Sequence, residues 1–138
     1  MGETMGNTAI LYATGLTKNT KKIAEYVAGK IGADTFNLKE ITMLDLDAYD
    51  TIVFGTGIHA GSPYKPVVSF IEKNGSQLAN KKIKLFISCM FSDEKGSKQC
   101  LDVADRLGIS DAVYFCKKGE TMNAAGVSTK VDDWIKGF

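Results

Sequence analysis

The sequence predicts an α/β fold: a doubly wound sandwich of three layers built around a five-stranded parallel sheet. Three observations lead to this prediction. Apolar runs alternate with amphipathic helical patterns five times along the chain. The first run is apolar at nearly every position, which is typical of a strand buried on both faces. No repeat, linker or low-complexity tract interrupts the alternation. Such a pattern requires helices on both faces of the sheet, joined by right-handed crossovers.

The expected strands differ in how apolar they are. The second strand alternates Phe36 and Leu38 with polar residues, and this weaker hydrophobicity suits a sheet edge. We therefore expect the strand order 2-1-3-4-5. The expected strands span residues 7–13, 34–38, 51–54, 83–89 and 112–116.

The expected helices follow the strands and end at turn residues. Gly32, Asn74-Gly75 and Gly108 are stop signals for the first three helices. Thr129 and Asp132 resemble a capping box at the start of the last one. The helices are expected from residue 19 or 20 to 31, from 64 or 66 to 73, through 100–107, and from 129 onward.

Composition narrows the possible functions. The 138 residues, 44% hydrophobic and 24% charged, fit one globular domain spanning residues 1–138. A net charge of +1 with no basic face argues against nucleic acid. No apolar run approaches the ~20 residues that cross a bilayer. There is no signal-peptide pattern, and Gly6 breaks a myristoylation motif. We expect no membrane partner and a cytoplasmic location.

The cysteines and the single histidine suggest no metal or catalytic site. Cys89, Cys100 and Cys116 are odd in number and widely spaced, so no disulfide framework is expected, as in a reducing cytoplasm. Cys89 and Cys116 end neighbouring strands; they either approach each other or serve as small buried apolar residues. Together with His59 they lack the spacing of a zinc site. No Ser-His-Asp or Cys-His constellation is readable.

The loop between the first strand and the first helix is rich in hydroxyl groups. Residues 14–20 read Thr-Gly-Leu-Thr-Lys-Asn-Thr. The first amides of a helix have no partner in the chain, and the helix dipole favours an anion there. The stretch lacks the Gly-x-x-x-x-Gly-Lys-Ser/Thr of a nucleotide P-loop. We predict a phosphate-binding loop, with an ordinary hydroxyl-capped helix start as the alternative.

Two further loops are expected at the same end of the sheet. Residues 55–63 nearly spell Gly-x-Gly-x-x-Gly, but Gly61 comes one residue late and the loop follows the third strand, which excludes a dinucleotide fingerprint. Residues 90–96 follow the fourth strand. Ligands of such sheets bind outside the carboxyl ends of the strands, where the strand order reverses. That point lies between the first and third strands, so one site is predicted.

With these motifs the chain resembles the short-chain flavodoxins and the flavodoxin-domain proteins over almost its whole length. The resemblance rests on the threonine-rich loop before Lys21-Lys22-Ile23-Ala24, on residues 49–58, and on the loop before residues 70–73. It implies a flavodoxin-like sandwich that binds FMN without a covalent link.

The family's first loop usually reads Ser/Thr-x-Thr-Gly-x-Thr. Here Thr17, Asn19 and Thr20 match, Gly15 replaces the first hydroxyl, and Lys18 replaces the glycine. The loop can also be taken as one residue longer. Lys18 either pairs with the phosphate or points into solvent.

The resemblance also implies how the flavin ring is held. Gly57 and Gly61 are candidate hinges whose peptide flips let a carbonyl face the flavin N5, with a plain glycine turn as the alternative. His59, Tyr64 and Phe91 are candidates to flank the ring; His59 can equally be surface, and Tyr64 can cap the next helix. The expected cofactor-binding residues are Thr14, Gly15, Leu16, Thr17, Lys18, Asn19, Thr20, Thr56, Gly57, Ile58, His59, Ala60, Gly61, Cys89, Met90 and Phe91.

The function implied is electron transfer by FMN cycling between oxidised, semiquinone and hydroquinone states. The expected partners are redox proteins, and the chain is expected to be a monomer or a weak dimer. Its net charge of +1 does not provide the acidic field of typical flavodoxins. The alternative is an FMN-dependent oxidoreductase acting on a small substrate or quinone, similar to menaquinone-dependent protoporphyrinogen dehydrogenase. A phosphorylated receiver domain is disfavoured, because Tyr12-Ala13 and Phe54-Gly55 supply no acidic residue.

Overall fold

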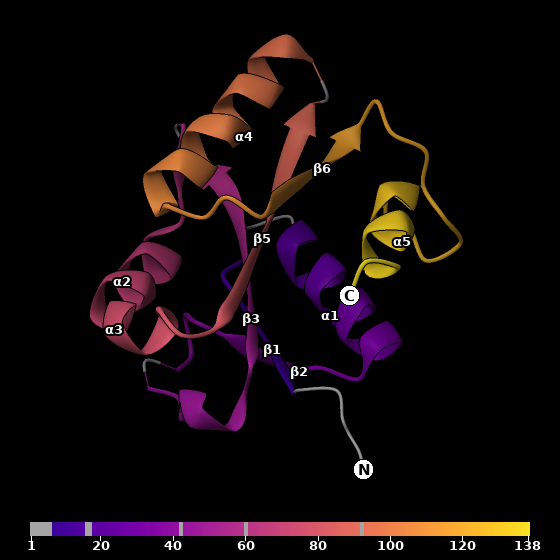
Figure 1. Ribbon diagram of the computed structural model, residues 1–138. Coiled ribbons are helices and arrows are strands. Elements are labelled where there is room, and N and C mark those ends of the chain that lie inside the picture. The colour runs from indigo at the N-terminus through magenta and orange to yellow at the C-terminus, as the bar shows by residue number, and fades with distance from the viewer. Residues whose placement is uncertain (1–6, 16–17, 42, 60, 92) are drawn as a thin grey trace.

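The computed structural model describes residues 7–15, 18–41, 43–59, 61–91 and 93–138, without the side chains of residues 90 and 91. Helices cover both faces of a central sheet (Figure 1). The elements in chain order are β1 (Thr8–Tyr12), α1 (Asn19–Ile31), β2 (Asp34–Asn37), the 3₁₀ turn η1 (Leu46–Ala48), β3 (Thr51–His59), β4 (Ser62–Pro63), α2 (Lys65–Lys73), α3 (Gly75–Leu78), β5 (Lys82–Phe91), α4 (Glu94–Leu107), β6 (Ala112–Lys118) and α5 (Thr129–Ile135).

The topology confirms the predicted doubly wound sheet. The strands lie in the order β2-β1-β3-β5-β6, with every pair along this path parallel. This is the expected order 2-1-3-4-5. The two-residue strand β4 was not expected; it pairs antiparallel with β3 and sets Ser62 opposite His59. A strand this short leaves no hydrophobic pattern in the sequence.

Two separate cores lie on the two faces of the sheet, because successive side chains of a strand point to opposite sides. α1 and α5 cover one face, where Phe86 packs with Trp134 and Phe115. α2, α3 and α4 cover the other, where Phe54 and Ile87 belong to a second cluster. Both sides of β3 and β5 are therefore buried, as their apolar sequences predict.

Two strands run further than the sequence suggests. β3 continues through residues 55–59, which were expected to begin the glycine-rich loop, and β5 continues to Phe91. The glycines of β3 explain the first extension. Gly55 lies against the ring of Phe86 and Gly57 against that of Tyr64, so neither position has room for a Cβ atom. Close packing of these neighbours overrides the weak strand propensity of glycine.

Helix ends follow the sequence signals in part. Gly32 and Gly108 end α1 and α4 with φ values of 73° and 72°, the left-handed conformation that glycine adopts at no steric cost. The expected capping box at Thr129 is wrong. Ser128 is the N-cap of α5, and its hydroxyl accepts a 3.2 Å hydrogen bond from the N–H of Lys130. Within the described ranges, every helix is too short or too polar to cross a bilayer.

Candidate functional site

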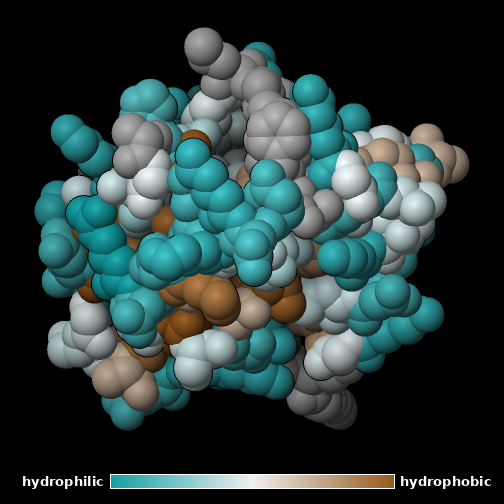
Figure 2. Space-filling view, turned by 90° about the horizontal axis from the view of Figure 1, so that it is seen from above, coloured by the Kyte–Doolittle hydropathy of each residue, from teal (hydrophilic) through white to brown (hydrophobic). Residues whose placement is uncertain are grey.

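The three expected loops meet at one edge of the sheet. The carboxyl ends of β1, β3 and β5 point upward in Figure 1. The strand order reverses between β1 and β3. Figure 2 looks down on this edge; hydrophilic side chains surround apolar residues near the middle of the face. The topology thus brings the first and second predicted loops to the switch point and sets the third beside them.

The first loop ends in an unusual backbone conformation. The N–H of Lys18 donates a 3.1 Å hydrogen bond to the carbonyl of Gly15. Lys18 is the N-cap of α1 and has a φ of 56°, in the left-handed region that non-glycine residues rarely adopt. Its side chain is exposed and does not cap the helix. Leu16 and Thr17 lie outside the described residues.

The start of α1 suits an anion. Its first turn contains no acidic residue, and the N-cap supplies no side-chain acceptor to its amides. Both flanking hydroxyl residues, Thr14 and Thr20, are buried. Thr14 accepts a long 3.4 Å hydrogen bond from the N–H of Lys21. Among the described residues, the structure therefore leaves backbone N–H groups at the helix start as the main candidate donors, rather than the hydroxyls of Thr14 and Thr20.

A side-chain hydrogen bond joins the start of α1 to β5. The Nδ2 atom of Asn19 lies 2.6 Å from the hydroxyl oxygen of Ser88, in β5. Ser88 lies opposite Gly57 of β3, so this bond connects α1 to the centre of the edge. Ser88 was not among the predicted site residues. The available signal was a polar residue near the carboxyl end of an otherwise apolar strand.

Tyr64 fills the space between the first and second loops. A Cβ atom on Gly15 would lie 2.6 Å from the Tyr64 hydroxyl oxygen, and one on Gly57 would lie 2.5 Å from it. The N–H of Tyr64 donates a 2.9 Å hydrogen bond to Thr56, whose hydroxyl donates to the carbonyl of Gly57. The two glycines thus admit a flat ring, and Tyr64 supplies one. The Thr56 hydroxyl holds the turn together inside the protein.

The remaining second-loop residues form a tight hairpin. The side chain of His59 is exposed, and Ile58 is partly buried against the core. Gly61 has a φ of 79°, as a short hairpin requires. Ala60 lies outside the described residues.

The third loop differs most from the sequence prediction. Cys89 and Cys116 form a disulfide between β5 and β6, which corrects the expectation that the cysteines remain reduced. The two residues lie directly opposite each other in the strand register, a relationship that residue spacing alone does not reveal. The cysteine count therefore carries no argument for a reducing compartment. The backbones of Met90 and Phe91 belong to β5, whereas their side chains lie outside the description.

Charged and polar groups surround the edge. A cavity of about 230 Å³ beside the start of α1 is lined by Asn19, Lys22, Lys117 and Ser128, among others. Burial raises the pKa of the Tyr12 hydroxyl at the end of β1, and the carboxylates of Glu25 and Glu40 raise it further. In the part of the chain that the structure describes, no cluster of His, Cys, Asp and Glu could hold a metal.

These features define a class of protein: a parallel α/β domain with an anion-suited helix start at the switch point of its sheet. A sequence model described as a flavodoxin domain matches residues 9–123. The chain therefore belongs to the flavodoxin domain family. An uncharacterised protein of Methanocaldococcus jannaschii is 33% identical to it over 112 residues, which cover 80% of this chain and 73% of that protein.

Solved structures share the fold. Rubredoxin:oxygen oxidoreductase from Desulfovibrio gigas superposes with a TM-score of 0.67 at 15% identity over 94% of this chain. The match spans only 34% of that enzyme's length. A flavodoxin of Fusobacterium nucleatum, bound to flavin mononucleotide, matches with a TM-score of 0.58 at 16% identity over 96% of both chains.

Proposed function

We propose that this chain binds FMN without a covalent link at the edge formed by β1, β3 and β5, and that it transfers electrons between redox partner proteins. The start of α1 carries this proposal. It combines a left-handed turn at Lys18, a first turn free of acidic residues, and a fixed position against β5 through Asn19 and Ser88. Phosphate is the part of FMN that such a helix start binds.

The residues of the edge fit FMN in separable roles. The first-turn amides of α1 would hold the phosphate, and the positive charges of Lys18 and Lys22 lie at the same helix start. Tyr64 would flank the ring, because Gly15 and Gly57 have no Cβ atoms and leave room for its flat side chain at this edge. FMN itself supplies the one- and two-electron chemistry, and the protein positions it and tunes its potential.

The comparisons support the proposal from a second direction. Membership of the flavodoxin domain family fits a flavin cofactor, and one structural neighbour is a flavodoxin bound to flavin mononucleotide. The expected cycle comprises the oxidised, one-electron reduced and two-electron reduced flavin. With a net charge of +1, the chain has no strong acidic field that would attract a basic partner surface.

A second candidate function is an FMN-dependent oxidoreductase that acts on a small substrate or quinone. One observation favours it: the cavity beside α1 presents Lys22 and Lys117, which suits a small substrate with carboxylate groups. Turnover of a soluble menaquinone analogue or of protoporphyrinogen distinguishes the two functions. An electron carrier shows fast single electron exchange with a partner protein and no multiple turnover of either compound.

Comparison of FMN with riboflavin tests the proposal. Riboflavin has the same ring but lacks the phosphate, so we expect the protein to bind FMN at least 100-fold more tightly, as two or more charge-assisted hydrogen bonds imply. Quenching of flavin fluorescence measures both dissociation constants. Equal affinity for the two flavins would refute the phosphate role of the α1 start. Failure to bind either would refute the proposed function.

A further inference from the structure

The Cys89–Cys116 bridge is built into the sheet. The two residues are direct partners in the parallel register of β5 and β6, and their Cα atoms lie 4.7 Å apart. Adjacent strands place opposite residues at about this separation whether or not a bridge exists. The same separation lies within the range that disulfides require. The disulfide and the two thiols therefore both fit this backbone, so the bridge can open and close without unfolding.

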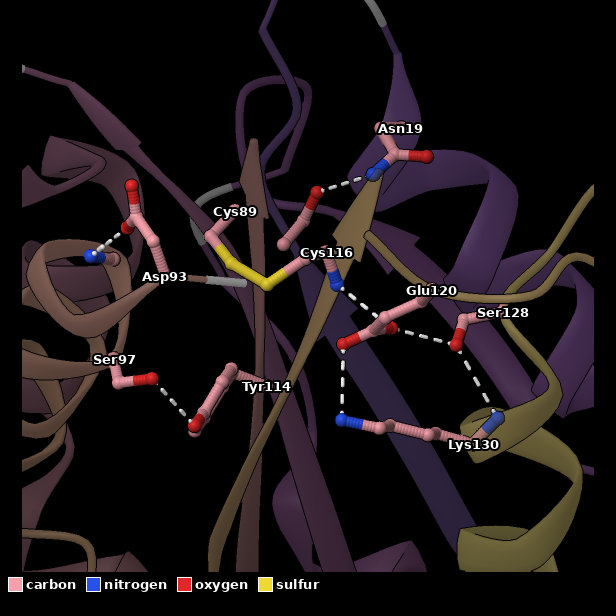
Figure 3. Close-up of a disulfide and its surroundings, with 11 residues drawn as sticks. Asn19, Cys89, Asp93, Ser97, Tyr114, Cys116, Glu120, Ser128 and Lys130 are labelled. Carbon is pink, nitrogen blue, oxygen red and sulfur yellow. Dashed lines mark hydrogen bonds and ion pairs between the residues drawn. A yellow bond between two sulfur atoms is a disulfide. The ribbon is translucent and has the colours of Figure 1, made fainter. Parts of the chain in front are cut away.

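The bridge lies at the proposed flavin edge. Cys89 directly follows Ser88, whose hydroxyl accepts the hydrogen bond from Asn19 at the start of α1, but the side chain of Cys89 points to the opposite face of the sheet, which α4 covers. Figure 3 shows the bridge joining β5 to β6, with Glu120 beside Cys116 and Asn19 on the separate helix α1. Cys89 is 8% exposed and Cys116 is 1% exposed. Bulk thiols therefore have little access to the bridge.

A polar network holds the Cys116 side of the bridge in place. The N–H of Cys116 donates a 3.0 Å hydrogen bond to the carboxylate of Glu120, which also accepts one of 2.6 Å from the Ser128 hydroxyl. The ammonium group of Lys130 lies 3.2 Å from the other carboxylate oxygen (Figure 3). The Glu120 side chain is only 3% exposed, so its charge needs these partners. This network fixes the turn after β6 independently of the bridge.

The third cysteine offers an internal control. Cys100, on α4, is buried in the same cluster of side chains as the bridge. Burial raises the pKa of its thiol to about 11, and the charge of Glu120 contributes. The thiolate is the nucleophile in thiol–disulfide exchange, so the Cys100 thiol is a poor competitor for the bridge at neutral pH.

We propose that Cys89 and Cys116 form a redox-active pair that exchanges two electrons with a flavin bound at the same edge. This inference rests on the proposed function. Opening of the bridge would take two electrons and two protons from a two-electron reduced flavin, which would thereby be oxidised. The bond between the two sulfur atoms breaks, and each sulfur takes one electron and one proton to become a thiol. When both the flavin and the cysteine pair are reduced, the chain would hold about four electrons per flavin instead of two.

An anaerobic reductive titration tests this pair. The protein loaded with FMN is titrated with dithionite, quenched in acid, unfolded and labelled with N-ethylmaleimide for mass measurement. We expect about four electrons per flavin, and labelling at all three cysteines afterwards. The FMN-free protein, treated identically, should be labelled at Cys100 alone, because its bridge has no internal electron donor.

Single cysteine variants test whether the additional electrons are taken up by the Cys89–Cys116 bridge. Cys89→Ser and Cys116→Ser should each lower the uptake to about two electrons per flavin, whereas Cys100→Ser should leave it at about four. Uptake of two electrons by the wild-type protein would overturn the inference. So would equal opening of the bridge without FMN, or labelling of all three cysteines before reduction. Lack of flavin absorbance before the titration would instead refute the proposed function, and the exchange with it.

Discussion

The side-chain amide of Asn19 donates a 2.6 Å hydrogen bond to the hydroxyl of Ser88, across 69 residues of sequence. It fixes the start of α1, which is proposed to hold the phosphate, against the carboxyl end of β5. Because both groups lie largely inside the protein, losing the bond leaves its partner without a hydrogen bond.

Removal of either partner should weaken FMN binding. Asn19→Ala and Ser88→Ala are each expected to raise the dissociation constant about 3- to 10-fold, as the loss of about 1 kcal/mol implies. The double variant should bind no more weakly than the poorer single variant, because the two residues act through one bond. Fluorescence titration measures all four proteins. Fully additive effects would show that the two residues act independently.

Gly57 should tolerate no side chain while Tyr64 is present. The Cβ atom of Gly57→Ala would lie 2.5 Å from the Tyr64 hydroxyl oxygen, so the free energy of unfolding should fall by about 1–3 kcal/mol. Tyr64→Ala in the same chain should recover part of that loss. Gly29→Ala is the matched control: no atom lies within 4 Å of its added Cβ, and helix propensity should raise stability by about 0.5–1 kcal/mol. Urea unfolding measures each value.

Substitution of Lys18 by glycine should stabilise the protein. A non-glycine residue at its φ of 56° lowers the free energy of unfolding by about 1–2 kcal/mol. Glycine avoids this cost, but it also increases the conformational entropy of the unfolded chain, which offsets part of the gain. Lys18→Gly is therefore expected to gain about 0.5–1 kcal/mol, and Lys18→Ala to gain nothing. Both variants remove the charge, so a shared loss of FMN affinity reports pairing with the phosphate. Equal stability of the two variants would argue against backbone strain at this turn.

The contact between α1 and α5 should depend on pH. Asp132 accepts hydrogen bonds from the Tyr26 hydroxyl and from Asn123, and these lower the pKa of its carboxyl group. Because the folded pKa lies below the unfolded value of about 3.9, the stabilisation is complete above that value and is lost as the pH falls through the folded pKa.

Tyr26→Phe tests this dependence, since the Tyr26 bond is the largest cause of the pKa shift. The variant should melt at a lower temperature than the wild type at pH 7. The difference should shrink as the pH falls from about 4 toward 2. Melting curves recorded by circular dichroism give both values. A difference that stayed constant over this range would mean that the contact involves no charged carboxylate.

The sequence predicts this fold well because the fold is encoded locally. The apolar run ending at Tyr12 and the stop at Gly32 each arise from short-range rules, and the weaker hydrophobicity of the second strand places it at the sheet edge. The features that it misses come from packing between distant segments. The strand state of Gly57 depends on Tyr64, and the role of Ser88 depends on Asn19. The sequence leaves open whether Cys89 and Cys116 approach each other, and the strand register decides that they do.

A visible absorption spectrum of the purified protein, recorded after incubation with FMN and removal of free ligand, tests the central claim most directly. We expect retained flavin absorbance at about one FMN per chain, with band positions shifted from those of free FMN by the ring's new surroundings. A colourless protein after desalting would contradict it. The edge formed by β1, β3 and β5 would then serve a different anionic ligand.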